Sequence, residues 1–288
     1  MNLQEFLKKA LREKWALGHF NFSELDQMRA IVEMCKTMAS PVMLGTSEGE
    51  REHIGLLETV ALRDALKKEF SIPIFLNADH TKSVEKAKAA IDAGYDSIHI
   101  DLSKLSLEEN IAGTKEIVRY AKNKNSAISV EGEVGYLITE SSKIYKENIL
   151  ISPESLTKPK EAVRFVEETE VDRFAPAVGN LHGIAANEPQ LDFDLIKKIR
   201  ETIPNEISLV LHGGSGIPDN QIKKAIEAGF SNIHISTELR VAYTTSLREN
   251  LSEYPDEVAI YKLDEKALEK MKEVLKQKLT LFKSINRI

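Results

Sequence analysis

Cysteine is almost absent from this sequence. Cys35 is the only one in 288 residues, so the chain cannot form an intrachain disulfide, and a metal site would have to use nitrogen and oxygen ligands. Cys35 shares the apolar face of a helical stretch with Met28, Ile31 and Val32. A small buried hydrophobic residue is expected there rather than a nucleophile, so we assign Cys35 no function.

Long apolar runs and a strong charge of one sign are also missing. No segment approaches the ~20 apolar residues that span a bilayer, and residues 1–15 alternate charged and apolar residues instead of forming the apolar core of a signal peptide. The formal net charge is −6, and the lysines and arginines are scattered rather than gathered into a basic stripe. We therefore expect a cytoplasmic protein that binds neither membranes nor nucleic acid.

Linkers rich in proline, glycine or serine are absent as well, which indicates a single domain. Hydrophobic residues make up 42% and charged residues 29% of the chain, as is typical of a soluble globular protein. The length suits one barrel, for which ~250 residues is typical. We predict one domain over residues 1–288, with a C-terminal helical extension at about 257–288.

Short apolar or β-branched runs alternate with amphipathic helical stretches along the whole chain, a pattern typical of a parallel sheet wrapped by helices. The eight predicted strands are Ala16–Asn21, Val42–Leu44, Ile74–Asn77, Ser97–Ile100, Ala127–Glu131, Phe174–Val178, Ser208–Leu211 and Asn232–Ser236. The predicted helices between them are Glu24–Met38, Leu57–Lys68, Ser83–Ala93, Leu107–Lys122, Pro159–Glu168, Phe193–Glu201 and Pro218–Ala228, and a last helix covers Leu263–Phe282.

Polar residues at the strand ends favour a closed barrel over an open sheet. They are Asn21, Ser47, Asp79, Asp101, Glu131, His182, His212 and Ser236. A barrel gathers its strand ends around one mouth, whereas an open sheet spreads them along an edge. We therefore predict an α/β fold, an eight-fold (β/α) TIM barrel with an additional C-terminal helix. The longest irregular stretch, from about Gly135 to Pro153, is a candidate lid.

Three histidines come at or after predicted strand ends: His80 in NADH, His182 in VGNLHG and His212 in LVLHGGSG. A single histidine in such a place is usually structural, but a barrel would bring all three to one mouth, where three imidazoles can form an open zinc site. Asp79 is the strongest acid/base candidate, because an acid beside a Lewis-acidic metal can exchange a proton with the substrate. Asp101 and Glu133 could bind a second cation or orient a histidine.

Glycines and hydroxyl residues mark an anion site at the last two strand ends. Gly213, Gly214 and Ser215 lie between a strand and the next helix, so that successive amides and the helix dipole can bind a phosphate. Ser236 and Thr237 hold the equivalent place after the eighth strand, which completes the usual barrel phosphate site. The alternative is that the glycines only form turns and the hydroxyls only cap a helix.

Taken together, these motifs resemble the class II, zinc-dependent fructose-bisphosphate and tagatose-bisphosphate aldolase family. The resemblance extends from GHFNFSELDQM through ADH, IHIDLSKLSLEENI, VEGEVG, GNLHG and LHGGSGIP to STELR. It implies a reversible retro-aldol cleavage of a ketose phosphate or bisphosphate to dihydroxyacetone phosphate and an aldehyde, a reaction of carbohydrate metabolism such as glycolysis. It also implies a homodimer or homotetramer.

The resemblance implies a role for each candidate residue. One Zn²⁺ would be held by His80, His182 and His212. Asp79 would exchange a proton with the aldehyde oxygen, and Glu140 is the approximate counterpart of the family's proton-abstracting glutamate. Asp101 and Glu133 would correspond to a secondary metal site. Substrate contacts are expected for Asn21, Ser47, Gly183, Gly213, Gly214, Ser215, His234, Ile235, Ser236 and Thr237.

Three features depart from the family pattern. His234 stands where the family usually has an asparagine, and Ser236 stands where fructose-bisphosphate aldolases proper often carry an aspartate. The loop after Gly135 lacks the usual glycine pair followed by an acid. Two alternatives follow, namely another metal-dependent lyase or isomerase and a noncatalytic sugar-phosphate-binding barrel. A binuclear-metal hydrolase is less favoured, because no His-x-His ends the first strand.

Overall fold

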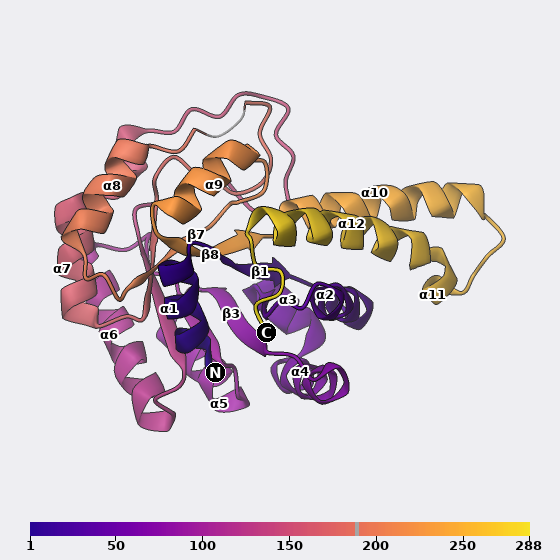
Figure 1. Ribbon diagram of the computed structural model, residues 1–288, viewed down its shortest axis with the longest axis horizontal. Coiled ribbons are helices and arrows are strands. Elements are labelled where there is room, and N and C mark those ends of the chain that lie inside the picture. The colour runs from indigo at the N-terminus through magenta and orange to yellow at the C-terminus, as the bar shows by residue number, and fades with distance from the viewer. Residues whose placement is uncertain (188–189) are drawn as a thin grey trace.

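Eight parallel strands, each hydrogen-bonded to the next in chain order, close into a barrel in the computed structural model, which describes residues 1–187 and 190–288 (Figure 1). The strands are β1 Leu17–Asn21, β2 Val42–Thr46, β3 Ile74–Thr81, β4 Ser97–Ile100, β5 Ser129–Val134, β6 Arg173–Pro176, β7 Ser208–Leu211 and β8 Phe230–Ile235. Pairing of β8 with β1 places His19 beside His234 and closes the ring. The predicted TIM barrel is confirmed.

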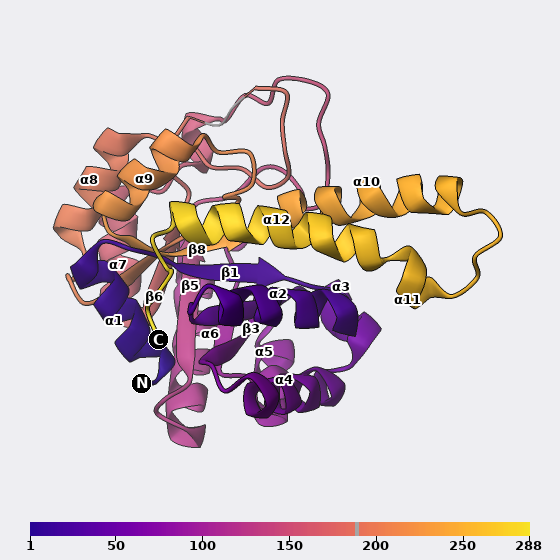
Figure 2. The same ribbon diagram turned by 45° about the vertical axis from the view of Figure 1, so that its right-hand side comes forward.

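Helices alternate with the strands and surround the barrel (Figures 1 and 2). They are α1 Leu3–Glu13, α2 Leu25–Thr37, α3 Glu48–Ile54, α4 Leu56–Phe70, α5 Val84–Ala93, α6 Leu107–Lys124, α7 Pro159–Thr169, α8 Phe193–Thr202, α9 Asp219–Glu227, α10 Thr237–Glu253, α11 Ile260–Leu263 and α12 Glu265–Leu281, with the short 3-10 helix η1 Pro153–Ser155. Every helix predicted between strands is present within two residues of its expected ends. The short helix α3 was missed, although its capping box between Ser47 and Glu50 is a recognisable signal.

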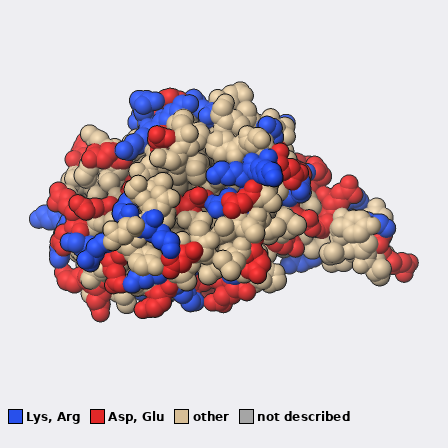
Figure 3. Space-filling view, turned by 90° about the horizontal axis from the view of Figure 1, so that it is seen from below, with Lys and Arg blue, Asp and Glu red and all other residues tan. Residues whose placement is uncertain are grey.

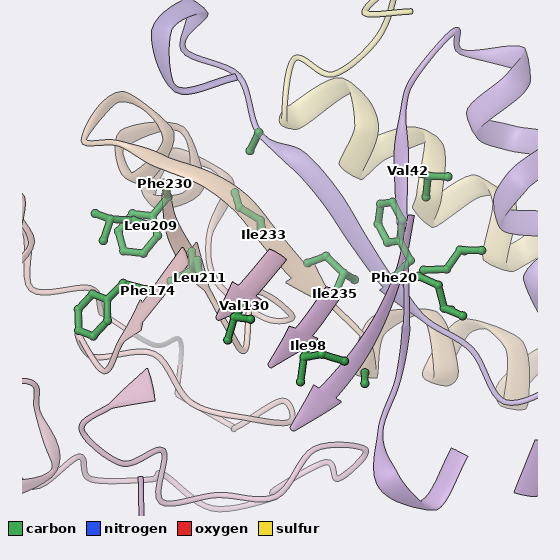
Figure 4. Packing of buried hydrophobic residues seen from close by; sticks show 14 of the residues in the cluster. Phe20, Val42, Ile98, Val130, Phe174, Leu209, Leu211, Phe230, Ile233 and Ile235 are labelled. Atoms are coloured by element: carbon green, nitrogen blue, oxygen red, sulfur yellow. The ribbon is translucent and has the colours of Figure 1, made fainter. Parts of the chain in front are cut away.

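Two apolar clusters hold the barrel together. The larger lies between the strands and the helices, and burial of each large side chain contributes roughly 1.5–3 kcal/mol. The smaller joins the amphipathic helix α1 to early residues of β1, β2 and β3 and includes Trp15. Figure 4 labels Phe20, Val42, Ile98, Val130, Phe174, Leu209, Leu211, Phe230, Ile233 and Ile235 in the larger cluster.

The boundaries of the strands that carry polar residues differ from the prediction. β3 continues to Thr81 through an irregular register, so Asp79 and His80 lie within the strand rather than after it. β5 begins two residues later than predicted and continues to Val134, which places Glu133 inside it. Hydrogen bonding to the neighbouring strands sets these ends, whereas the prediction stopped where the apolar pattern was interrupted.

The C-terminal helix is confirmed over Glu265–Leu281. It runs beside α10 and α2, and with α10 and α11 it forms an arm that projects from the barrel (Figures 1 and 2). The chain then returns to the barrel, where the backbone N–H of Ala16 donates to the carbonyl of Phe282 at 2.9 Å. The arm is thus anchored at its base, and its far end extends away from the barrel.

Acidic and basic side chains are interspersed on the face shown in Figure 3. Within the described parts of the chain, we find no helix that has both the length and the hydropathy needed to cross a bilayer.

Candidate metal centre and substrate pocket

A pocket of about 450 Å³ opens at the carboxyl ends of the strands. Most of the predicted site residues line it, namely Asn21, Ser47, Asp79, His80, Asp101, Glu133, Glu140, His182, Gly183, His212, Gly213, Ser215, His234, Ser236 and Thr237. Two do not. Ile235 packs in the apolar core outside the barrel, and the amide of Gly214 already donates to the carbonyl of His234 at 3.1 Å.

Two of the three predicted metal-binding histidines are held by carboxylates. Nδ1 of His80 lies 2.9 Å from Oδ2 of Asp101, and Nε2 of His212 lies 2.6 Å from Oε1 of Glu131. A carboxylate on one ring nitrogen fixes the orientation of the ring and leaves the other nitrogen for an ion. Nε2 of His182 is buried without a hydrogen-bond partner, which makes it a third available nitrogen.

The three rings lie next to one another. The ring centroid of His80 is 4.7 Å from that of His182 and 4.6 Å from that of His212, and the other two centroids are 6.1 Å apart. The tighter group, with ligand atoms within 4.8 Å of one another, contains Asp79, His80, His99 and His212 but not His182. Imidazole nitrogens and carboxylate oxygens are ligands that suit zinc and similar divalent ions, so the residues present fit a metal ion.

Burial keeps two of the three predicted histidine ligands in the form that binds metal, whereas Asp79 and Asp101 raise the pKa of the third, His80. Burial lowers the pKa of His182 to about 3, and the neighbouring His80 adds to the effect. Burial also lowers the pKa of His212 well below its usual value. Both imidazoles are therefore neutral near pH 7, which is the state that coordinates an ion.

Asp79 is buried among groups that keep it ionised. Burial alone would raise its pKa, but the rings of His80, His234 and His99 beside the carboxylate bring the pKa well below its usual value. Its Oδ2 accepts from Nδ2 of Asn21 at 3.1 Å. Asn21 thus orients the carboxylate, in addition to lining the pocket.

A second pair of carboxylates faces the pocket from the other side of His80. His80, Asp101 and Glu133 have ligand atoms within 4.8 Å of one another. The hydroxyl of Ser103 donates to Oδ1 of Asp101 at 2.6 Å, whereas Oε2 of Glu133 has no hydrogen-bond partner. Asp101 therefore orients His80, and the group has the composition of an oxygen-rich cation site.

One side of the pocket is lined by glycines and hydroxyl residues, and its shape depends partly on the backbone conformation of the glycines. Gly213 and Gly183 have φ values of +62° and +81°, and a Cβ on Gly213 would clash with the carbonyl oxygen of Leu181. Ser236 does not cap α10, and its hydroxyl is buried without a partner. The hydroxyl of Ser215 instead accepts from the first turn of α10. The capping alternative is thus wrong for Ser236.

The irregular stretch after β5 lies against the pocket. The hydroxyl of Thr139 donates to the carbonyl of His182 at 2.7 Å, and the amide of Ser142 donates to the hydroxyl of Thr237 at 3.2 Å. Glu140 lines the pocket, but its side chain is 72% exposed and pairs with Lys143. To reach a substrate beside Asp79, the carboxylate of Glu140 would have to turn inward.

A fully buried polar layer below the pocket was missed by the sequence analysis. At its centre Nη1 of Arg173 lies 2.6 Å from Oε2 of Glu131 and 3.0 Å from Oδ1 of Asn232. His19 and His99 lie in the same interior and are also completely buried. The signal was present as polar residues at alternate strand positions, which face one side of a strand: Ser97, His99 and Asp101; Ser129, Glu131 and Glu133; Asn232, His234 and Ser236.

A second carboxylate at the mouth, Glu50, was also missed. It accepts from Nδ2 of Asn21 at 3.2 Å and from the amide of Ser47 at 2.7 Å, and it pairs with Arg240. Glu50 therefore links the N-terminal cap of α3 to the residue that orients Asp79.

Known proteins resemble this chain over its full length. The family model described as "Fructose-bisphosphate aldolase class-II" matches residues 1–287. Fructose-bisphosphate aldolase of Geobacillus stearothermophilus is 39% identical over 259 residues, which cover 89% of this chain and 87% of that protein. The Staphylococcus aureus (strain Mu50 / ATCC 700699) protein of the same name is 35% identical over 290 residues, covering 100% and 98%.

Solved structures agree. The YdjI aldolase from Escherichia coli K12 superposes with a TM-score of 0.83 at 28% identity, covering 99% of this chain and 98% of that one. The fructose-bisphosphate aldolase structure from Campylobacter jejuni gives a TM-score of 0.82 at 20% identity, covering 99% and 95%, and therefore supports the fold alone.

Proposed function

The chain belongs to the class II fructose-bisphosphate aldolase family of carbon–carbon lyases, and we propose that it reversibly cleaves a ketose phosphate or bisphosphate to dihydroxyacetone phosphate and an aldehyde. One observation carries the proposal: an ionised carboxylate, Asp79, lies directly beside a group of histidines with available nitrogens in a pocket that Gly183, Gly213, Ser215, Ser236 and Thr237 also line. A metal-assisted retro-aldol reaction uses an ion that polarises the carbonyl and a group that moves the hydroxyl proton.

We propose that His80, His182 and His212 hold one Zn²⁺. When bound there, the ion would supply Lewis-acid polarisation of the ketose carbonyl. The neutral rings of His182 and His212, and the carboxylates that orient His80 and His212, support this ligand set. Asp101 and Glu133 would form the secondary cation site.

Proton transfer is assigned to two carboxylates. Asp79, held by the amide of Asn21, would exchange a proton with the aldehyde-side oxygen. Glu140 would take the carbon-bound proton of dihydroxyacetone phosphate in the synthetic direction, after leaving Lys143 and turning into the pocket.

The substrate phosphate would lie on the side formed by Gly183, Gly213, Ser215 and the His234–Thr237 segment. The unpartnered hydroxyl of Ser236 is available to donate to a phosphate oxygen. Because Gly214 and Ile235 contribute no free amide or side chain that reaches the pocket, we expect their role to be in shaping the backbone. Ser47 would lie near the aldehyde part, on the side of Glu50 and Arg240.

We further propose a cytoplasmic homodimer or homotetramer. Three apolar residues near the tip of the arm support self-association, since Val258 is 92%, Ile260 61% and Tyr261 69% exposed. Such a cluster on a projecting element is typical of a surface that is covered by a partner.

The test combines metal analysis with two assays on the purified protein. Release of dihydroxyacetone phosphate from a panel of ketose phosphates should require the metal, and carbon-bound protons of dihydroxyacetone phosphate should exchange with solvent. His212→Ala should lose both metal and activity, whereas Asp79→Ala should keep exchange but lose condensation with an aldehyde. Exposed His53 provides the control variant His53→Ala, which should behave as wild type.

Each alternative predicts a different outcome. A noncatalytic sugar-phosphate-binding barrel would bind the panel without proton exchange. Another lyase or isomerase would exchange the proton but release no dihydroxyacetone phosphate. Full activity and metal content in His212→Ala would overturn the proposed site.

A further inference from the structure

A buried carboxylate and a cation face each other at the mouth of the pocket. Glu50 on α3 is 6% exposed, and its Oε1 accepts a hydrogen bond from Nη2 of Arg240 on α10. The side chain of Arg240 is 26% exposed and lines the pocket, so its guanidinium is within reach of a bound substrate. None of the roles proposed above uses either charge.

The other oxygen of Glu50 holds the carboxylate in this place. Oε2 accepts from the backbone amide of Ser47 at 2.7 Å and from Nδ2 of Asn21 at 3.2 Å. The bond to Ser47 is half of the capping box that begins α3. Glu50 would lose these bonds if it turned away from Arg240, so the start of the helix fixes the carboxylate beside the guanidinium.

Asn21 connects Glu50 to the proposed chemistry. The side-chain nitrogen of Asn21 that donates to Glu50 also donates to Oδ2 of Asp79 at 3.1 Å. One amide group therefore bridges Glu50 and the carboxylate that would exchange a proton with the aldehyde-side oxygen. Under the proposed function Ser47 and Asp79 both face the aldehyde half of the substrate, so the Glu50–Arg240 pair lies at the aldehyde end of the pocket.

A phosphate on the aldehyde half would need a cation at this end, and Arg240 is the best placed. Among the lining residues that the structure describes, the other lysines and arginines are Lys82 and Lys104, and both are exposed. They lie toward Glu140, whose pKa is lowered mainly by Lys143 and also by these two residues. Solvent screens exposed lysines, whereas a partly buried guanidinium can bind a phosphate through two parallel hydrogen bonds.

Glu50 offsets the charge of Arg240. A phosphate that approached Arg240 would have to displace a carboxylate that is already paired, or lie beside it as a second negative charge in a partly buried place, and both are unfavourable. A hydroxyl group meets no such penalty, because the pair has no net charge and the guanidinium has further N–H donors. This end of the pocket therefore favours hydroxyl groups over a second phosphate.

We propose that Glu50 determines substrate specificity by occupying Arg240, so that the pocket selects an uncharged, hydroxylated aldehyde and the ketose substrate carries one phosphate rather than two. The inference rests on the proposed function, and it chooses between the ketose phosphate and the bisphosphate that the proposed function leaves open. The single phosphate is the one that the proposed function places beside Gly213 and Ser215.

Binding of two sugar alcohols that cannot be cleaved tests the selection without turnover. Mannitol 1-phosphate and mannitol 1,6-bisphosphate share one carbon chain and differ only in the second phosphate. Isothermal titration calorimetry of each with the full-length protein in the presence of Zn²⁺ gives the ratio of their Kd values. Wild type should bind the monophosphate at least as tightly as the bisphosphate. Tighter binding of the bisphosphate by about tenfold or more, the gain from one charge-assisted hydrogen bond, would overturn the proposal without any substitution.

Glu50→Gln removes the charge and keeps the shape of the side chain. The amide oxygen can still accept from Ser47 and Asn21, while the NH₂ group faces the guanidinium and releases it. The ratio of Kd values should shift toward the bisphosphate by about 10–100-fold, as expected when a phosphate gains a charge-assisted hydrogen bond. Glu52→Gln is the matched control. Glu52 is an exposed carboxylate on the same helix that pairs with Lys86, so its substitution should keep the wild-type ratio.

A double variant shows where the gain comes from. When Glu50→Gln is combined with Arg240→Met, no guanidinium is left to bind the second phosphate, so the ratio should return to the wild-type value. If Glu50→Gln keeps the wild-type ratio, or if the double variant keeps the gain, Glu50 does not act through Arg240 and the proposal is overturned.

Kinetics separate this inference from the proposed function. Solvent exchange of the carbon-bound proton of dihydroxyacetone phosphate requires no aldehyde. Its absence in wild type would contradict the proposed function, while the mannitol ratio would still test Glu50. Where exchange occurs, condensation should have a higher kcat/KM with glyceraldehyde than with glyceraldehyde 3-phosphate. The opposite order together with exchange would overturn the inference and leave the proposed function intact.

Discussion

At the residue scale, the charged interior is the least ordinary feature of this barrel. The interior of a TIM barrel is usually filled by branched apolar side chains. Here Arg173 is completely buried and its guanidinium contacts Glu131, Asn232 and the hydroxyl of Ser129. Removing one partner of a buried ion pair leaves an uncompensated charge, which typically costs about 3–5 kcal/mol.

We predict that Arg173→Leu lowers the free energy of unfolding by about 3–5 kcal/mol, because the carboxylate of Glu131 remains buried without its cation. Urea denaturation at pH 7 measures the change. Arg164→Leu is the matched control: Arg164 is 45% exposed, and its pairs with Glu108 and Glu168 are screened by solvent and contribute little to stability. Equal losses in the two variants would contradict the importance assigned to the buried pair.

The buried histidines also make stability depend on pH. Burial, with the neighbouring His212, lowers the pKa of His234 to about 3, and His182 is lowered to the same value. In the unfolded chain both titrate near 6.5. Below that pH the unfolded state binds protons that the folded state does not, so stability falls as the pH is lowered.

We predict that the metal-free protein loses on the order of 2 kcal/mol per histidine between pH 6.5 and pH 5. His19 and His212 also have pKa values that burial lowers well below the usual value, so they add to the loss in the same direction. His80 and His99 have raised pKa values and are already protonated in the folded state, and Asp79 has a lowered pKa and is ionised in both states, so these three residues change the stability little over this range. Urea midpoints at the two pH values test this, and His234→Asn should show a smaller difference than wild type.

At the element scale, strands and helices were predictable because their apolar faces repeat with the right period. The strand order followed from the β/α alternation, and Asp79, His80 and His212 were brought to one pocket as expected. The inner polar layer was not predicted. His19, His99 and Arg173 lie inside strands, whereas the predicted site residues were those at the strand ends. The alternation of polar residues marks a polar face on these strands, but it does not show which residues pair across the barrel, because the partners lie far apart in sequence.

The turn after β7 depends on a backbone conformation that only glycine adopts easily. We predict that Gly213→Ala destabilises the protein by about 1–3 kcal/mol, since φ is +62° and a Cβ would meet the carbonyl of Leu181. Gly49→Ala, within α3, is the control. Open space surrounds that position, and alanine favours a helix, so stability should stay equal or rise slightly. Thermal unfolding of both variants distinguishes the two sites.

The loop after β5 should carry a catalytic group rather than stabilise the fold. We predict that Glu140→Gln slows solvent exchange of the carbon-bound proton by about 10²–10⁴-fold, the usual range for loss of a general base. Metal content and the urea midpoint should not change, because the side chain is exposed. Glu154→Gln, also an exposed carboxylate between β5 and α7, is the control. An exchange rate equal to that of wild type would remove Glu140 from the mechanism.

At the scale of the whole molecule, the arm formed by α10, α11 and α12 exposes apolar residues whose role a single chain does not explain. Its base is well packed, with α12 against α10 and α2, and Lys278 pairs with Glu238 at 2.7 Å. Its tip presents apolar side chains to solvent, whereas the pocket at the barrel mouth is built from the chain's own residues. Self-association through the arm would bury the tip without closing the pocket.

Self-association through the arm can therefore be tested separately from the active site. We predict that wild type runs as a multiple of 32.3 kDa, and that Val258→Glu combined with Tyr261→Glu shifts it toward 32.3 kDa. Four or more buried carboxylates at a shared contact would repel one another and remain unsolvated. Leu57→Glu introduces the same charge at a 69% exposed leucine on α4 and should leave the mass unchanged. Light scattering after size-exclusion chromatography gives the masses. A monomeric wild type, or an unchanged mass in the double variant, would show that the tip is not the contact.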